Sequence, residues 1–179
     1  MENRTTWVID PAHSEITFKV KHLMIANVKG EFRRFDATLD TVGDDFSKGR
    51  IRATIDAASI FTNNDDRDTH LRSADFFDAD NHGEISFEGK EFTQLDDENF
   101  RLKGLLSMRG VEKEVVLEGE FGGFMKDPYG NIKAGFTLSG KINRKDWGLN
   151  WNAALETGGV LVSEDVRIAA DMQFVKKAA

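Results

Sequence analysis

The side chains of this 179-residue chain that are best suited to metal binding or acid–base catalysis are its four histidines. They are His13, His22, His70 and His82. No two of them have the i, i+4 spacing that places two ligands on one helix face, and no HExxH motif occurs. The chain has no cysteine, which excludes disulfides, thiolate ligands and cysteine nucleophiles. We therefore expect no metal ion and no cofactor.

The polar motif with the most chemical potential is Arg67-Asp68-Thr69-His70. Its residue types suit general acid–base catalysis. They also suit a structural role, because a polar cluster on a helix that closes a barrel end must satisfy its hydrogen bonds internally if it is buried. We favour the structural interpretation, with His70 in a local ion pair or hydrogen bond, four residues after Asp66.

The elements that position these side chains are indicated by alternation of apolar and polar residues, which is typical of strands with one buried face. Runs of this kind lie at 15–21, 50–56, 100–106, 115–121, 136–142 and 166–174. About eight such strands with short connections favour a meander, and closure into a barrel leaves no exposed edge. We therefore predict an all-β fold, an eight-stranded antiparallel β-barrel, with residues 1–179 as a single domain.

Turn and helix signals complete the outline. Asp127–Asn131 separates two alternating runs and predicts a hairpin. The segment Asn64–Phe77 predicts a helix capped by Asn63 or Asn64, and a second helical turn is expected near His22–Asn27. One or two short helices would thus close one end of the barrel. Glycines inside the strands predict bends or bulges at Gly104, Gly119, Gly135 and Gly140.

The composition limits the partners of the protein. Fourteen phenylalanines against one tyrosine make an interior with few polar groups. An eight-stranded barrel holds either its own side chains or one small ligand, and alternation alone favours the packed core. The net charge of −7 disfavours nucleic acid and anionic membranes. No run approaches the ~20 apolar residues of a membrane helix, and the N-terminus has no signal-peptide pattern. We expect no nucleic-acid partner, no membrane insertion and a cytoplasmic location, or a periplasmic one if a signal has been removed.

Five motifs in order along residues 7–174 resemble those of the YceI-like family of lipocalin-like proteins. They are the opening Trp7–Ser14, the V-x-G-x-F segment Val28–Phe32, the pair Ser59–Thr62 and Arg67–Phe77, the G-x-L-x-x-R-G turn Gly104–Gly110, and the N-R-x-D-aromatic-G segment Asn143–Gly148. Two departures lie at a strand entrance: Asn81-His82-Gly83 replaces the usual Tyr-Pro, and Glu88-Gly89 stands where the family tends to have serine. The resemblance implies a lipocalin-like barrel that holds a polyisoprenoid or another long-chain amphiphile.

The resemblance implies a protein that binds and carries or sequesters a long-chain apolar lipid or isoprenoid ligand in the barrel interior, without chemistry. The residues expected to contact the ligand are Phe18, Val20, Ile55, Phe76, Phe87, Leu102, Leu106, Phe136, Leu138, Trp147, Trp151, Ile168 and Met172. Because an unpaired charge is costly inside such a barrel, the polar head would lie near Arg67, His70, Asn143, Trp147 or Trp151.

Two alternatives remain open. One is a small enzyme acting on a lipid-like substrate at the barrel mouth, with His70, Arg67 or Asp146 near the reacting group. The other is a packed barrel that acts only through its surface, for example as a homodimer.

Overall fold

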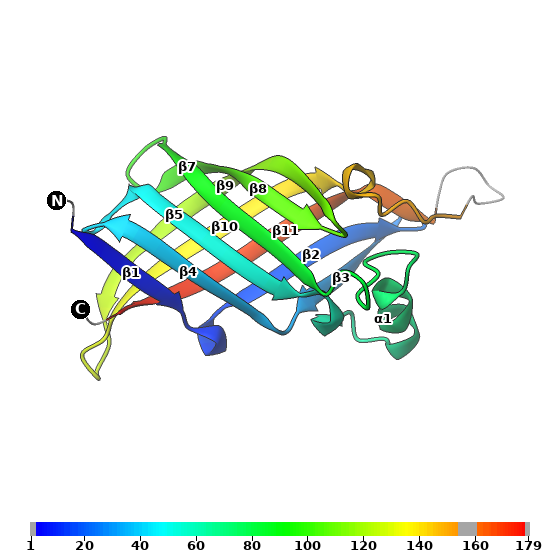
Figure 1. The fold of residues 1–179 in the computed structure, drawn as a ribbon, viewed down its shortest axis with the longest axis horizontal. Helices are drawn as coiled ribbons and strands as arrows, with labels where there is room; N and C mark the ends of the chain where they lie inside the picture. The colour runs from blue at the N-terminus through cyan, green and yellow to red at the C-terminus, as the bar shows by residue number, and fades with distance from the viewer. Residues whose placement is uncertain (1–2, 154–160, 178–179) are drawn as a thin grey trace.

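The computed structural model describes residues 3–153 and 161–177, and these residues form strands with one α-helix (Figure 1). The strands are β1 (Arg4–Ile9), β2 (Glu15–His22), β3 (Ala26–Phe32), β4 (Phe35–Val42), β5 (Asp45–Asp56), β6 (Ile60–Phe61), β7 (Glu84–Gln94), β8 (Asn99–Met108), β9 (Val111–Lys126), β10 (Ile132–Asn143) and β11 (Val162–Lys176). The helix α1 spans Asp65–Arg72. Short 3₁₀ turns lie at Pro11–His13, Ala57–Ser59 and Arg144–Trp147.

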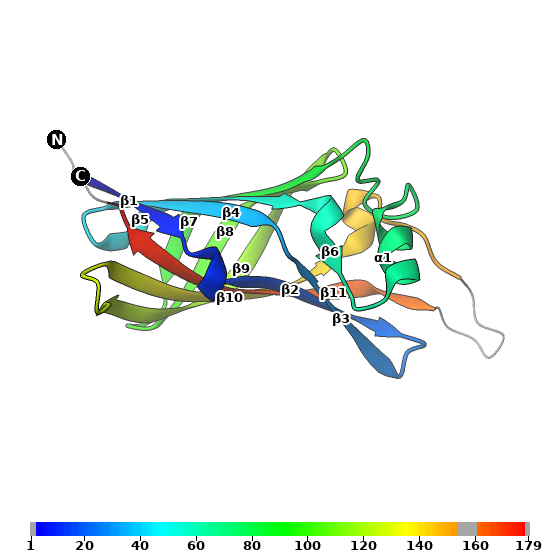
Figure 2. The same ribbon diagram turned by 90° about the horizontal axis from the view of Figure 1, so that it is seen from below.

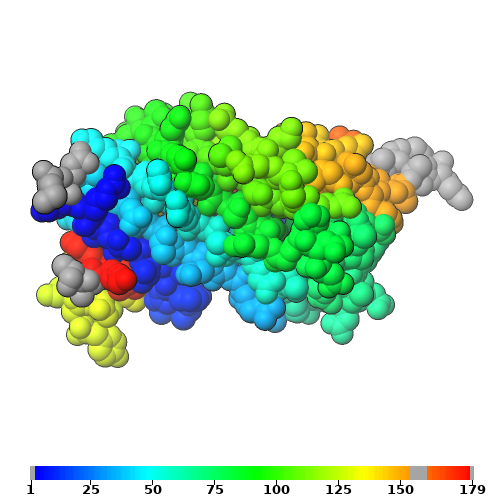
Figure 3. All heavy atoms as spheres, viewed as in Figure 1, coloured from blue at the N-terminus to red at the C-terminus, as the bar shows by residue number. Residues whose placement is uncertain are grey.

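Eight of the described strands form a closed antiparallel ring. Their order is β1-β4-β5-β7-β8-β9-β10-β11, and pairing of β1 with β11 closes it. At the closing pair Ile9 lies opposite Phe174. The ring confirms the predicted eight-stranded antiparallel barrel. Figure 3 shows the side chains of β4, β5 and β7 covering one side of it as a continuous wall.

The remaining strands continue the wall beyond the ring at one end. The chain turns from β1 into β2 through Pro11–His13, from β3 into β4 through Arg33 and Arg34, and from β5 into β6 through Ala57–Ser59. Strand β2 pairs with β11, β3 with β2, and β6 with β3. Figure 2 shows the β2–β3 hairpin diverging from the rest of the barrel at the end where α1 lies. We call this the flared end, and the opposite end, at the β9–β10 hairpin, the closed end.

The core lies inside the ring, on the predicted faces of the strands. Its most deeply buried large side chains include Trp7, Leu39, Leu102, Phe100 and Phe174, each exposed by 2 % or less. Fully burying a side chain of this kind contributes about 1.5–3 kcal/mol, so the ring interior is the main source of stability.

Two glycines inside strands make room for aromatic rings instead of bending the strand. A Cβ atom on Gly119 would lie 2.3 Å from two ring carbons of Phe100, and one on Gly30 would lie 2.2 Å from the ring of Phe18. The pairing of β9 with β10 does shift between Gly135 and Phe136, as a bulge does. The prediction of bends was therefore correct near Gly135, whereas Gly119 has a packing role.

The predicted helices need correction. Helix α1 is capped as expected, because Asn64 accepts a hydrogen bond from the backbone N–H of Arg67 at 2.9 Å. It ends at Arg72 and not at Phe77, since the Ser73 N–H and hydroxyl both bond to the carbonyl of His70 and terminate it. The expected helical turn near His22–Asn27 is wrong: that segment is the tight turn of the β2–β3 hairpin.

Candidate ligand-binding site

The closed end is filled by aromatic rings. Phe46 of β5 lies 4.8 Å from Phe121 and 5.4 Å from Phe136, measured between ring centroids, and Phe121 lies 5.1 Å from Phe136. The cluster continues to Phe100 and Phe174. Ring pairs at these distances are attractive beyond their buried area. This half of the interior is therefore occupied by the protein's own side chains.

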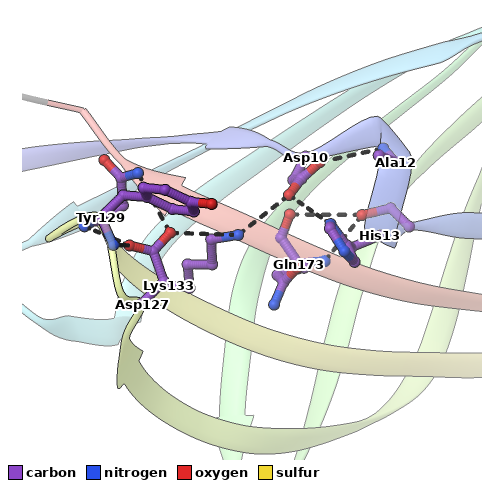
Figure 4. A network of polar contacts seen from close by, with 9 residues as sticks. Asp10, Ala12, His13, Asp127, Tyr129, Lys133 and Gln173 are labelled. Atoms are coloured by element: carbon purple, nitrogen blue, oxygen red, sulfur yellow. Dashed lines mark hydrogen bonds and ion pairs between the residues drawn. The ribbon is translucent and has the colours of Figure 1, made fainter.

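A polar network ties the strands together on the outside of the same end (Figure 4). Asp10 Oδ2 lies 2.9 Å from His13 Nδ1 and 3.4 Å from Lys133 Nζ, which lies 3.7 Å from Asp127 Oδ2. The hydrogen bond with His13 is the main reason that the pKa of Asp10 is lowered. Burial acts to raise the pKa of Asp127. Hydrogen bonds from Asn131 and from the backbone N–H of Tyr129 outweigh this effect, so the pKa is lowered. The network fastens the β9–β10 hairpin to the β1–β2 connection.

The flared end presents apolar side chains that are only half-buried. One row crosses four neighbouring strands on the inner face, and we call it the outer apolar row. It consists of Ile142, Val166, Val20 and Val28, each directly opposite the next. All four keep part of their surface exposed. Two residues deeper, Ile168 and Phe18 form the centre of the next row and are also half-buried.

Aromatic side chains cover the interior from the side of α1. The His70 ring lies 4.6 Å from the ring of Trp151 and 5.1 Å from that of Phe76, in both cases edge to face. His70 Nε2 lies 2.8 Å from Asp75 Oδ2, so its polar partner is Asp75 and not Asp66. On the side of β3, the Phe77 ring lies 5.7 Å from Phe32.

The charged pair at the start of α1 makes hydrogen bonds within the protein, as the structural interpretation expects. Buried Asp68 accepts hydrogen bonds from the backbone N–H and the hydroxyl of Thr62, at 2.8 and 2.6 Å. Arg67 donates to the hydroxyl and the carbonyl of the same threonine, at 2.7 and 2.6 Å. These bonds fix α1 to Thr62, the residue that follows β6. Both charged groups are therefore engaged with the protein's own polar atoms.

Buried Arg144 organises the segment that carries Trp151. Its guanidinium donates to the carbonyls of Leu149 at 2.6 Å, Trp151 at 2.9 Å and Ser163 at 2.9 Å, and more weakly to that of Val162 at 3.3 Å. Burial lowers the pKa of Arg144. Because Arg144 bonds to the main chain of Trp151 and of β11 together, it holds the indole against His70.

Sequence reasoning missed two further parts of the site. Arg109 was only a motif residue in the sequence, yet it donates to the carbonyl of Gly148 and, at 2.8 Å, to that of Ala74. It thus joins the segment after α1 to the segment after β10. Three residues of the outer apolar row were not among the expected ligand contacts, although Val166 stands in phase with Ile168 in the alternating run: Val28, Ile142 and Val166.

The thirteen expected contact residues fall into two groups. Four are half-buried and lie toward the flared end: Phe18, Val20, Trp151 and Ile168. The others are buried in the core: Ile55, Phe76, Phe87, Leu102, Leu106, Phe136, Leu138, Trp147 and Met172. Whether each contacts a ligand stays a prediction.

The residues expected near a polar head are also divided. Trp147 is buried and its indole N–H donates to the carbonyl of Leu106 at 2.9 Å, which leaves it no polar group for a ligand. Arg67 is exposed, His70 and Trp151 are half-buried, and half-buried Asn143 accepts from the N–H of Lys145. The half-buried groups lie on the segments that surround the flared end.

Comparison with known protein sequences gives one consistent result. The family model described as YceI-like domain matches residues 7–174. A UPF0312 protein from Staphylococcus aureus is 42% identical over 171 residues, which cover 95% of this chain and 97% of the relative. A UPF0312 protein from Staphylococcus epidermidis has the same identity and coverage.

Solved structures have the same fold. The Campylobacter jejuni YCEI protein is 33% identical with a TM-score of 0.76, covering 89% of this chain and 91% of that one. Burkholderia cenocepacia BcnA is 18% identical with a TM-score of 0.80 and coverage of 92% and 98%. A polyisoprenoid binding domain from Saccharophagus degradans is 14% identical with a TM-score of 0.73 and coverage of 96% and 98%. At these last two identities the likeness concerns the fold alone.

Proposed function

The chain belongs to the family of YceI-like domains, and we propose that it binds a long-chain apolar amphiphile whose tail enters the barrel through the flared end. The ligand class is that of a polyisoprenoid, an isoprenoid quinone or a fatty-acid-like lipid. The observation that carries this proposal is the outer apolar row, whose four aliphatic side chains lie on an inner face and yet stay half-buried. The Saccharophagus degradans protein that shares the fold is a polyisoprenoid binding domain, which supports the same ligand class.

The energetics favour entry of the tail first. Each methylene removed from water contributes about 0.8 kcal/mol, so about ten of them would gain about 8 kcal/mol before the cost of association. An unpaired charge on the same surface would cost several kcal/mol. Among the described residues, His70, Asn143 and the segment of Trp151 offer polar groups at the edge of this surface. The head is therefore expected to stay there.

The closed end sets the limit of the tail. Rings of Phe46, Phe121 and Phe136 fill it, so a tail can pass the second row of Ile168 and Phe18 only by displacing side chains. Because Ile168 and Phe18 are half-buried themselves, we expect them to be the deepest residues that a tail contacts without rearrangement.

Binding without chemistry is part of the proposal. The second candidate, a small enzyme acting on a lipid-like substrate, has one observation in its favour: His70 and Asp75 form a pair at 2.8 Å beside Trp151. A His70→Ala variant separates the two. A carrier would keep its ligand with modestly weaker binding and an altered head-group preference, whereas an enzyme would lose turnover.

The test is native mass spectrometry of the purified protein, followed by solvent extraction and identification of the bound material. Val166→Asp places an unpaired carboxylate in the outer apolar row. Ala169→Asp is its matched control, because Ala169 is exposed on the same strand and pairs with uncharged Thr17 and Ser139. We expect retained lipid in the wild type and in Ala169→Asp, and none in Val166→Asp. Protein that is free of lipid in all three would refute the proposal.

A further inference from the structure

A row of cations crosses the outer face of the flared end. Lys141, Arg167, Lys19 and Lys29 lie directly opposite one another on β10, β11, β2 and β3, and all four are exposed. We call them the basic row. It lies on the opposite face from the outer apolar row, so this four-stranded sheet is apolar inside and cationic outside.

The basic row is not explained by the stability or the overall charge of the protein. Like charges directly opposite one another destabilise a sheet, and the chain carries a net charge of −7. Lys141 lies 3.7 Å from Asp165. Within residues 3–153 and 161–177, Lys19, Lys29 and Arg167 form no ion pair. Three aligned charges are thus available to an anionic partner.

The tip of the same hairpin is apolar and exposed. Ile25 is 85% exposed and Met24 is 51% exposed, with Leu23 beside them. Leu23 and Met24 have φ angles of 54° and 63°, and the N–H of Ile25 bonds to the carbonyl of His22. This is a tight turn of the type that normally takes Asn and Gly. Large apolar side chains there combine an unfavourable backbone conformation with exposure to water, as at sites kept for function.

We propose that the apolar tip and the basic row together dock on the surface of an anionic lipid membrane. Lys19 stands four residues before Leu23, which places the charge about 13 Å from the tip at about 3.3 Å per residue. A hairpin lying on a bilayer can therefore seat its tip among the head groups while its lysines stay close to the lipid phosphates. Apolar side chains in the interface and cations above it are the two requirements for this kind of binding.

A membrane uses both features, whereas a nucleic acid would use only the basic row. A nucleic acid or other soluble polyanion would take the basic row and leave Leu23, Met24 and Ile25 in water. A second copy of the chain, related by a two-fold axis, would place its basic row against that of the first copy, where the like charges repel each other. The acidic remainder of the protein would be repelled by anionic lipid, which orients the molecule with the hairpin toward the surface.

Docking on a membrane does not require that the barrel binds a ligand. Its role in ligand transfer rests on the proposed function. The hairpin that would touch the membrane also carries Val20 and Val28 of the outer apolar row on its inner face. Docking would bring the flared end to the lipid surface, where a tail could pass into the barrel without crossing water. No helix among the described residues has the length and apolar character needed to span a membrane.

The test is co-sedimentation with vesicles of phosphatidylcholine alone and of equal parts phosphatidylcholine and phosphatidylglycerol. We expect the wild type to bind the mixed vesicles, and this binding to fall at high salt. Lys19→Glu combined with Lys29→Glu should weaken it by about 25-fold or more, at about fivefold for each cation removed from the surface. Ile25→Asn removes the apolar side chain without adding a charge, so it should weaken binding without altering its salt dependence. The control is Lys48→Glu combined with Lys126→Glu, which changes the net charge equally on exposed residues near the closed end.

Four results would overturn the proposal. They are no binding of the wild type to mixed vesicles, an equal loss of binding in the control pair, binding to duplex DNA that exceeds vesicle binding and is unchanged by Ile25→Asn, and a dimer in sedimentation velocity that the variants of the basic row abolish. Native mass spectrometry of the same variants separates the two proposals. The lysine variants should keep their bound lipid but no longer bind vesicles. Val166→Asp should bind vesicles but retain no lipid.

Discussion

Arg144→Met is the substitution for which the structure makes the most quantitative prediction. Methionine keeps most of the apolar stem but removes every donor, so the carbonyls of Leu149, Trp151 and Ser163 lose their partners. A buried carbonyl without a partner costs about 1–3 kcal/mol. Removing a buried cation also relieves its desolvation, which offsets part of this loss. We therefore expect a net decrease of about 3 kcal/mol in the free energy of unfolding.

The assay is equilibrium urea unfolding followed by tryptophan fluorescence. The control is Lys145→Met, because the neighbouring Lys145 is exposed and its ion pair with Glu164, at 2.9 Å, contributes at most about 1 kcal/mol. Arg144 also holds the main chain of Trp151, whose indole packs against His70 at the flared end. The variant should therefore also bind ligand more weakly. The reasoning is refuted if the free energies of unfolding of Arg144→Met and Lys145→Met agree within about 1 kcal/mol and the slope m is unchanged. The four hydrogen bonds of the Arg144 guanidinium would then not organise this segment.

Three further predictions concern the closed end. Gly119→Ala should destabilise the protein by about 1–3 kcal/mol in urea unfolding, because its Cβ would overlap the ring of Phe100; no loss would contradict the assigned packing role. Phe136→Ala should cost about 3–5 kcal/mol while native mass spectrometry still finds bound lipid, and loss of lipid in the folded variant would mean that the tail reaches this end. The lowered pKa values of Asp10 and Asp127 stabilise the folded protein above the unfolded pKa of about 3.9, and this stability is lost as the pH falls below about 4. Asp10→Asn should therefore flatten the dependence of the melting temperature on pH, and an unchanged dependence would exclude the network as its source.

The barrel itself could be predicted because alternation has a direct physical meaning in a strand. Residues two apart share a face, so the phase of Phe18, Leu138 or Met172 shows which side is buried. Alternation does not show how deeply a residue lies along the barrel. That depth depends on what covers each end of the sheet. Leu138 is 5% exposed and packed in the core, whereas Val166, in phase with it across the β10–β11 pairing, is half-buried at the flared end.

The cover over the flared end could not be predicted because long-range contacts determine it. Arg109 reaches two segments that are 35 and 39 residues away along the chain, and nothing local marks it as their link. The end of α1 was misplaced because Phe76 and Phe77 suit a helix, yet they pack on different partners, Trp151 and Phe32. The hairpin turn was missed because propensity argues against Leu23 and Met24 at positive φ.

The most direct test of the central claim is a titration of the delipidated protein with amphiphiles that share one head group and differ in tail length. If the tail lies along the outer apolar row and the row of Ile168 and Phe18, affinity should rise about fourfold per added methylene, at about 0.8 kcal/mol each, and level off once the tail reaches the closed end. A matched series with one tail and different heads should change affinity far less. Affinity that is indifferent to tail length would contradict the account, because no apolar surface of the barrel would then be taking up the ligand.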